Sequence, residues 1–398
     1  LRVPTANATS DLLADSVGNY GVVIDSRNLS RRLAFGAAFL FVLSPSLAFS
    51  QADLAEQSHR AKELMAQGRF EEAIPVCERL VEALPGNPGL ILNLGLAEEM
   101  AGHPAKAIPH FEAVLKVQPD SIPALTSIAT ARLQLHQPDL AISPLKKLVT
   151  AQPENLNARG MLAGAEMGIN AFEDAAEQYR QLTTLDPSDA KAWYGLGKAY
   201  ESLATASFHK LSDASPESPY VAVLIADSRV QRRQYRSAFF FYRQAEPKLA
   251  DLPGLHAGLA KIYKSTGHAD WAGDEERREQ NLPAPACNVQ TSECHFLRGE
   301  FLEAVQAGKA SSTPAALFWA TRSYNQLAAH AFEQLQNLPE SVERHAFKAQ
   351  ILQDHGENSD AANEWRAALK LDPGNTRLEN ELAASLFLGK DYQSAMPI

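Results

Sequence analysis

Cys287, Cys294 and His295 form the most concentrated group of potentially reactive side chains in the sequence. They would supply three ligands to a zinc ion, but a structural zinc site needs four, and no fourth ligand is evident. In an oxidising compartment the two cysteines would instead form a disulfide that closes a short loop, and otherwise they are free thiols. We favour the Cys287–Cys294 disulfide and predict no metal site. The third cysteine, Cys77, falls at a position that we expect to be a small buried hydrophobe.

No familiar catalytic motif accompanies these residues. The sequence contains no glycine-rich phosphate loop, no Gly-x-Ser-x-Gly elbow and no His-Glu-x-x-His motif. The 11 histidines are scattered, and His110, His209 and His256 fall on expected helices with no partner at ligand spacing. We therefore predict no enzymatic activity, no catalytic residues and no cofactor.

The composition narrows the class of partner. Lys and Arg number 37 against 47 Asp and Glu, a net charge of −10. This balance gives no basic footprint for nucleic acid, so we expect protein or peptide ligands. Three cysteines are also too few to form a disulfide scaffold.

An export signal is predicted at 29–50. Two arginines precede an uncharged apolar run, 33–43, and small residues follow it, which is the order of parts in a secretory signal peptide. The alternative is an uncleaved anchor, but the run is too short to span a bilayer comfortably. We expect cleavage before Gln51, a periplasmic or secreted protein, and no stable membrane span after cleavage. Residues 1–28 are polar and patternless, and our hypothesis is that they lie upstream of the true start.

A period of 34 residues runs through the chain after Gln51. Alanines recur at Ala73, Ala107, Ala141 and Ala175. Prolines recur 12 residues after each alanine, at Pro85, Pro119, Pro153 and Pro187. Small residues recur 12 residues before each alanine, at Ala61, Gly95, Ala129 and Ala163. This spacing predicts one helical hairpin per unit: small residues let two helices approach closely, and proline ends the second helix. Such hairpins must stack on one another to bury their faces.

These units resemble the tetratricopeptide repeat. Residues 175–187 look like the second helix of the family, and 193–200, Trp-Tyr-Gly-Leu-Gly-Lys-Ala-Tyr, match its first helix. The resemblance covers nearly all of 53–398 and implies an all-α fold, a right-handed α-solenoid of hairpins. It also implies a scaffold that binds proteins or peptides on its concave surface. The alternative is the non-catalytic repeat region of a larger enzyme, such as a glycosyltransferase whose catalytic domain is missing.

The resemblance places certain first-helix positions on the concave surface. In the second to fifth units these include Asn93, Leu96, Thr126, Thr130, Asn157, Met161, Met167, Tyr194 and Lys198. Asn93 and Lys198 are too isolated to form the clamp with which some family members hold a C-terminal carboxylate. The groove is lined by small, neutral residues and in part by methionine, which suits an apolar ligand segment. The alternative is that these residues only pack against neighbouring helices.

Two long helices interrupt the pattern. The turn expected after Tyr200 is missing, which predicts one continuous helix at 190–213. The same residues recur 124 positions later, so we expect a second long helix near 313–337. The helix that follows, about 219–232, should pack directly against the first long helix. We expect the concave groove to be interrupted at both places and the ligand to bind mainly on 53–187.

The resulting domain prediction is a first array at 51–280, an irregular cysteine-containing junction at 281–312 and a second array at 313–398. The last unit has a first helix, but its second stops at Ile398. We expect either that the chain continues beyond this point or that a partner covers the open face.

Overall fold

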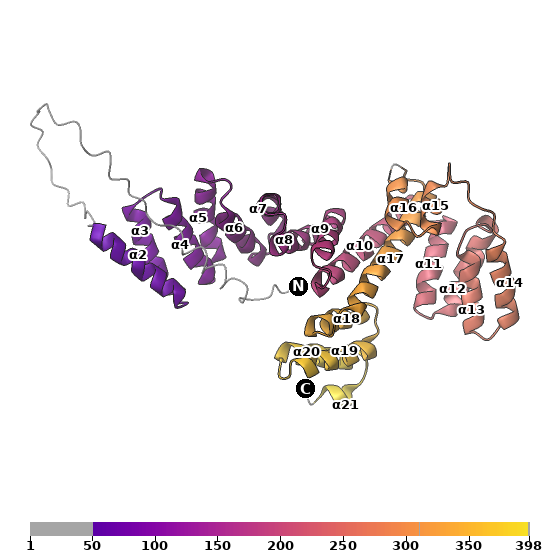
Figure 1. Ribbon diagram of the computed structural model, residues 1–398. Helices are drawn as coiled ribbons and strands as arrows, with labels where there is room; N and C mark the ends of the chain where they lie inside the picture. Colours follow the sequence, from indigo (N-terminus) through magenta and orange to yellow (C-terminus); the bar gives the residue numbers. More distant parts are fainter. Residues whose placement is uncertain (1–50, 310, 397–398) are drawn as a thin grey trace, which may run out of the picture. The chain divides into compact units, whose positions relative to one another are not determined.

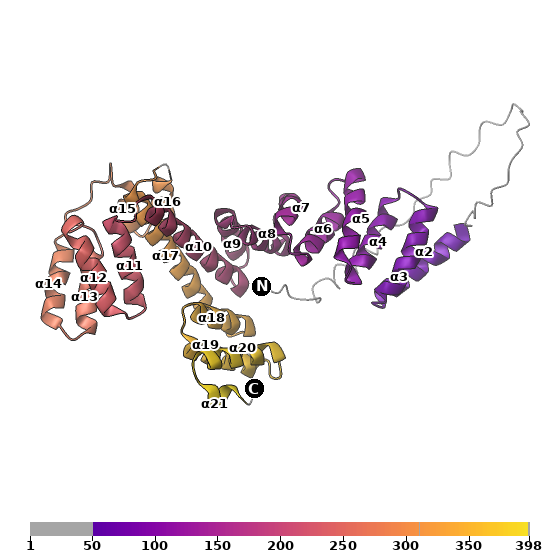
Figure 2. The same cartoon turned by 180° about the vertical axis from the view of Figure 1, so that it is seen from behind.

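A computed structural model of the protein describes residues 51–309 and 311–396. All regular elements in this part of the chain are helices, which confirms the predicted all-α fold of consecutive hairpins (Figures 1 and 2). The predicted signal segment, 29–50, and residues 1–28 lie outside the described residues. The chain divides into two compact units between Ile169 and Asn170, and each is described by itself.

The first unit is a row of helical hairpins. Its helices are α2 (Gln51–Ala66), α3 (Phe70–Ala83), α4 (Pro88–Met100), α5 (Pro104–Val117), α6 (Ile122–Gln134), α7 (Pro138–Ala151) and α8 (Leu156–Gly168). The alanines of the period, Ala73, Ala107 and Ala141, are fully buried. At Gly95 the helices approach so closely that a Cβ would come within 2.7 Å of the Phe111 ring. Small residues thus set the hairpin spacing, as predicted.

The hairpin turns need a left-handed backbone residue at the same 34-residue period. Gly68 and Gly102 take φ angles of 72° and 87°, as expected for the glycines of these turns. At the next equivalent turn His136 has φ 56°. The turn geometry therefore persists where glycine does not. Asn87 and Asn155 cap the next first helices, α4 and α8, through their side-chain oxygens.

The second unit contains the two long helices. Its helices are α9 (Phe172–Leu185), α10 (Ala190–Ala214), α11 (Pro219–Gln231), α12 (Tyr235–Ala245), the 3₁₀ helix η1 (Glu246–Lys248), α13 (Leu255–Ser265), α14 (Ala269–Gln280), α15 (Thr291–Leu297), α16 (Phe301–Gly308), α17 (Pro314–Asn337), α18 (Val342–Asp354), α19 (Asn358–Leu371), α20 (Thr376–Leu388) and α21 (Tyr392–Ala395). Both long helices, α10 and α17, were predicted from the sequence and are confirmed.

The long helices lie side by side and antiparallel (Figures 1 and 2). Tyr200 of α10 stacks on Tyr324 of α17 with ring centroids 6.2 Å apart. Nearer the start of α10, Gly197 faces Phe332, close to the end of α17. Each long helix therefore finds its antiparallel partner in the other.

The second half of α17 takes the place of the missing second helix of the α10 hairpin. A Cβ on Gly197 would come within 2.2 Å of the Phe332 ring, just as one on Gly95 would meet Phe111. In both cases the glycine is in a first helix and the ring lies four residues after an alanine. The contact normally made within one hairpin is thus made between helices more than a hundred residues apart.

The contacts of the two long helices are symmetric about the Tyr200–Tyr324 pair. Tyr194 of α10 stacks on Phe347 of α18, with centroids 4.7 Å apart. Phe318, which follows Tyr194 by 124 residues, contacts Tyr220 of α11 at 5.0 Å. Each long helix therefore contacts the helix that follows the other long helix in the sequence: α10 contacts α18, and α17 contacts α11.

This arrangement corrects one expectation. The helix predicted at 219–232 is present as α11, but its main partner is α12, and the long face of α10 is covered by α17. The sequence pattern did not indicate this partner, because a missing turn says only that the helix continues.

Cys287 and Cys294 are joined in a disulfide that closes the loop before α15. Cys294 is buried, and Phe296, two residues on, contacts Trp319 of α17. The remaining cysteine, Cys77, is buried, and burial raises the pKa of its thiol to about 11.

Candidate ligand-binding surface

The family resemblance assigns the inner face of the first unit to the first helices α4, α6 and α8. Asn93 and Leu96 on α4 are half-buried, as are Thr126 and Thr130 on α6. The two threonine hydroxyls donate to carbonyls of their own helix, at Ile122 (2.9 Å) and Thr126 (3.0 Å). Both hydroxyls are therefore already paired within α6.

The α8 part of this face is more open. Asn157 is exposed, and Met161 and Met167 are half-buried. Between the methionines, a Cβ built on Gly164 would have no atom within 4 Å. The flexible thioethers therefore border free space, which is the setting in which methionine adapts to an apolar ligand.

Glu99 is a residue of this face that the sequence reasoning did not single out. It lies on α4, where its side chain is half-buried. Burial raises the pKa of Glu99 to about 7. Its position in the repeat was the available signal: it is the one charged residue at the family's inner positions of α4, α6 and α8.

The two predicted residues of the second unit are occupied by internal contacts. Tyr194 stacks on Phe347. The Lys198 ammonium pairs with Glu201 (2.8 Å) and with Asp354 of α18 (3.0 Å). Burial opposes the charge of Lys198, but these hydrogen bonds outweigh it and raise its pKa to about 12. Both residues therefore serve the contact between α10 and α18.

The inner face that includes the start of α17 is closed. Phe318 and Trp319 are 0% and 3% exposed. The guanidinium of Arg322 lies 5.2–5.6 Å from the rings of Phe296, Phe318 and Trp319 and donates to the Pro253 carbonyl at 2.8 Å. Phe318 and Trp319 belong to a hydrophobic core with α11–α13, and Phe296 packs against it.

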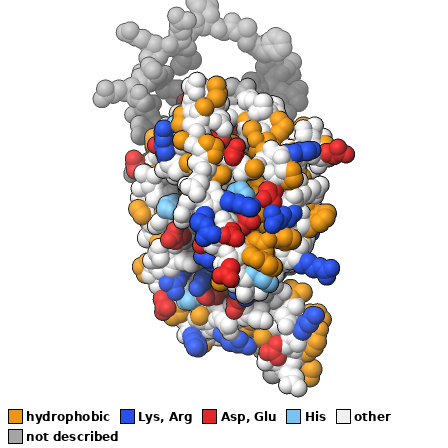
Figure 3. Space-filling model, turned by 90° about the vertical axis from the view of Figure 1, so that its right-hand side faces the viewer, with side chains coloured by type: hydrophobic (Ala, Val, Ile, Leu, Met, Phe, Trp, Pro, Cys, Tyr) orange, Lys and Arg blue, Asp and Glu red, His pale blue; other side chains and the backbone are white. Residues whose placement is uncertain are grey.

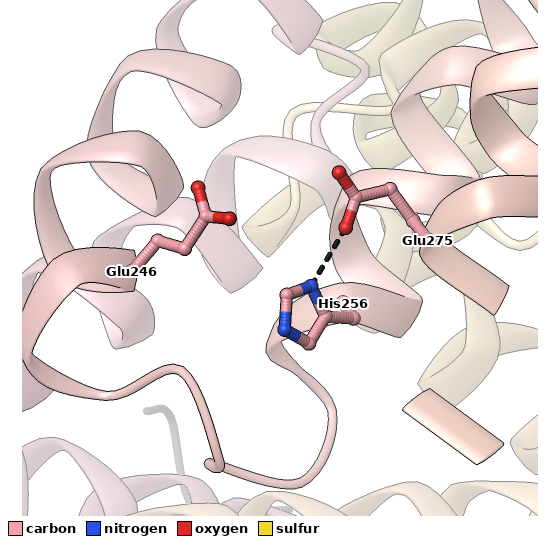
Figure 4. Close-up of side chains that lie close together, drawn as sticks. All are labelled: Glu246, His256 and Glu275. Carbon is pink, nitrogen blue, oxygen red and sulfur yellow. Dashed lines mark hydrogen bonds and ion pairs between the residues drawn. The ribbon is translucent and has the colours of Figure 1, made fainter. Parts of the chain in front are cut away.

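Glu246, His256 and Glu275 form the cluster in the described residues whose atoms could surround a metal ion, with ligand atoms within 4.8 Å of one another (Figure 4). His256 lies at the start of α13 and is 4% exposed. Its Nδ1 lies 2.6 Å from Glu275 Oε2 on α14, and its Nε2 lies 3.0 Å from the Ala250 carbonyl. Both ring nitrogens therefore already have an oxygen partner within the chain.

Two arginines already neutralise these carboxylates. Arg243 lies 2.5 Å from Glu246, and Arg278 lies 3.4 Å from Glu246 and 3.5 Å from Glu275. The same kind of pair recurs between His345 of α18 and Glu364 of α19 at 2.7 Å, with the same 19-residue separation. We therefore interpret the cluster as an ion-pair network that joins the two helices of a hairpin.

The charged side chains on the face shown in Figure 3 are mixed in sign, with acidic and basic groups interspersed among hydrophobic ones. This view shows no continuous basic field of the kind that nucleic-acid binding uses. Within the described part of the chain, no helix is both long enough and apolar enough to cross a bilayer.

Comparison with family models matches the chain in three places. A model described as TPR repeat matches 169–203, and models described as Tetratricopeptide repeat match 64–133 and 348–398. The matches lie in both units. The chain is a tetratricopeptide-repeat protein. Proteins built from these repeats bind protein partners, so the repeats support a protein-interaction scaffold.

Solved structures similar to this tetratricopeptide-repeat protein include "MamA MSR-1 C2", at 24% identity and TM-score 0.35, over 37% of this chain and 85% of that one. "MamA 41-end from Desulfovibrio magneticus RS-1" matches at 19% identity and TM-score 0.35, over 49% and 93%. A tetratricopeptide repeat protein from Parabacteroides merdae ATCC 43184 matches at 12% identity and TM-score 0.35, over 84% and 98%. No curated protein matched the chain.

Proposed function

We propose that this tetratricopeptide-repeat protein is an exported scaffold that binds peptide segments of other proteins on the inner face of α4, α6 and α8. The main support for this binding surface is the difference in exposure between inner residues of the first unit and inner residues of the second. On α8, Asn157 is exposed and Gly164 borders open space, whereas Phe318 and Trp319 on the inner side of α17 are buried. A ligand needs the open face.

The chemistry of this face favours a segment that is mostly apolar. Leucine, threonine, asparagine and methionine side chains dominate the inner positions of the three helices. Such a surface offers apolar contact with few fixed hydrogen bonds, so it can repack around different side chains.

Site-specific photo-crosslinking tests the surface. A photoreactive phenylalanine analogue at Met161 should crosslink discrete partner proteins, whereas the same analogue at Lys116, exposed on the second helix α5, should not. Equal crosslinking from both positions would contradict binding on the inner face.

The export proposal rests on the signal-like segment at 29–50. The Cys287–Cys294 disulfide is compatible with it, because disulfides persist in oxidising compartments. N-terminal sequencing of the exported product should find Gln51, or a residue within two or three of it. A product that begins before Arg31 would contradict cleavage.

A further inference from the structure

The turn between α11 and α12 concentrates positive charge in a chain whose net charge is −10. From 228 to 245 the sequence contains five arginines and no Asp or Glu. Arg243 pairs with Glu246. Arg229 donates a hydrogen bond to the side chain of Gln234. The other three are exposed, and none of them has an ion pair or a side-chain hydrogen bond with another described residue; they are Arg232, Arg233 and Arg236, together named the arginine turn.

Two of these arginines occupy positions that do not favour them in the folded chain. Arg236 lies in the first turn of α12, where the helix dipole disfavours a positive charge. The second helices α3, α9 and α14 carry acidic side chains in their first turns instead. Arg233 has φ 56°, the left-handed conformation that Gly68 and Gly267 take in equivalent turns. An anion bound at the arginine turn would be favoured by the guanidinium groups and by the amino end of α12 together.

Exposed aromatic side chains lie beside the arginine turn. Phe240, one helical turn after Arg236 on the same face of α12, is 64% exposed. The α13–α14 turn lies at the same end of this group of helices (Figure 1), and Trp271, just after it, is 55% exposed. The ring of Phe239 contacts Tyr263, and Tyr263 contacts Trp271, so the rings of the two hairpins are continuous. Aromatic and basic side chains occur together at membrane–water interfaces, where rings enter the headgroup region and cations meet phosphates.

We propose that the arginine turn docks the protein on the surface of a bilayer that contains anionic phospholipid. The three guanidinium groups bind headgroup phosphates, and the ring of Phe240 enters the interface. A bilayer suits these side chains better than an acidic peptide does, because a flat surface reaches the turn and the start of α12 at once and also accommodates the exposed ring. The contact is peripheral, and it is independent of the peptide-binding face of the first unit.

Co-sedimentation with lipid vesicles tests the proposal. The full chain is mixed with phosphatidylcholine vesicles that either contain or lack phosphatidylglycerol, and the ratio of the two affinities is measured. The apolar run at 33–43 is uncharged and common to all variants, so it does not affect the comparison between them.

Two triple variants are compared with the full chain. The arginine-turn variant carries Arg232→Gln, Arg233→Gln and Arg236→Gln. The control variant removes the same charge from three exposed positions of the first unit, through Arg60→Gln, Arg79→Gln and Lys116→Gln. Circular dichroism and thermal melting of each variant establish that the fold is retained.

We expect the full chain and the control variant to prefer vesicles that contain phosphatidylglycerol. The arginine-turn variant should bind these vesicles about a hundredfold more weakly, because each basic side chain near an anionic surface contributes about fivefold. Binding should weaken as the salt concentration rises, since salt screens exposed charges. Phe240→Ser should weaken binding to the same vesicles about fivefold, because the interface no longer buries a ring.

Four outcomes would overturn the proposal. Absence of a preference for phosphatidylglycerol in the full chain would exclude anionic docking. Equal losses in the two triple variants would show that net charge matters and the arginine turn does not. Displacement from the vesicles by inorganic phosphate at constant ionic strength would indicate a site for a single phosphate. Binding of an oligoglutamate peptide at the arginine turn, without binding to vesicles, would assign this surface to an acidic segment of a protein.

Discussion

Tyr200 stacks on Tyr324, its equivalent 124 residues later in the chain, with ring centroids 6.2 Å apart. A residue that meets its own equivalent lies on a local two-fold axis, and the flanking contacts obey the same symmetry. Lys198 pairs with Asp354 of α18, and Arg322, 124 residues after Lys198, lies 3.7 Å from Asp227 of α11. The second unit is therefore built like an isologous dimer within one chain.

The tyrosine pair should be energetically coupled. We expect Tyr200→Ala and Tyr324→Ala each to destabilise the protein by about 3–5 kcal/mol, because both side chains are nearly buried. The double variant should lose less than the sum by about 0.5–1.5 kcal/mol, the usual worth of an aromatic pair beyond its area. Urea unfolding of the four proteins measures this difference. Strict additivity would contradict direct coupling.

Glycine-to-alanine substitutions should have opposite effects at two helical positions. At Gly197 the added Cβ would meet Phe332 at 2.2 Å, so we expect a loss of about 1–3 kcal/mol from overpacking. At Gly164 the Cβ meets open space, so the same substitution should stabilise α8 by about 0.5–1 kcal/mol. The free energies of unfolding of the two variants provide the comparison. A neutral Gly197→Ala would contradict the close approach of α10 and α17.

The sequence was sufficient to predict the hairpins and both long helices, because a period of 34 and a missing turn are local signals. It did not show which helix packs against α10, because that helix, α17, lies about 124 residues later in the sequence. The duplication of Tyr200 as Tyr324 was a usable signal, because repeated halves can pair symmetrically. We interpreted this recurrence as marking equivalent positions in two separate arrays. Tyr194 and Lys198 were predicted to face a ligand from their positions in the repeat, and in the structure they contact α18.

Local sequence signals also failed to identify the partners of polar side chains. His256 was predicted to have no partner at ligand spacing, whereas Glu275 lies 19 residues on, in the second helix of the hairpin. The recurrence of this spacing at His345 and Glu364 was the available sign of a structural pair. Glu99 could be recognised by its position, but the burial that raises its pKa depends on how the helices pack.

The His256 pair should be structural and independent of metal. Glu275→Gln removes the buried carboxylate that faces His256, and we expect it to destabilise the protein by about 3–5 kcal/mol, as is usual when one partner of a buried pair is lost. Glu276→Gln, at the next position and half-exposed, should cost less than about 1 kcal/mol. Thermal melting should be unchanged by a chelator such as EDTA. A lower melting temperature in EDTA would instead indicate a bound ion.

The contact between α10 and α18 should weaken as pH rises above neutrality. His355, just after α18, lies 3.2 Å from Glu201 of α10, and this hydrogen bond raises the pKa of His355 above its ordinary value of 6.5. A raised pKa in the folded state means that folding favours the protonated ring, so the contribution is complete below about pH 6.5 and disappears as pH rises through the folded-state pKa. The other charged groups near His355 are Lys198 and Asp354, which pair with each other, and Glu357, whose charge also raises the pKa of His355. Melting temperatures of the protein and of His355→Gln between pH 5.5 and 9 should therefore converge as the pH increases. A difference that stays constant over this range would show that His355 stabilises the contact without its charge.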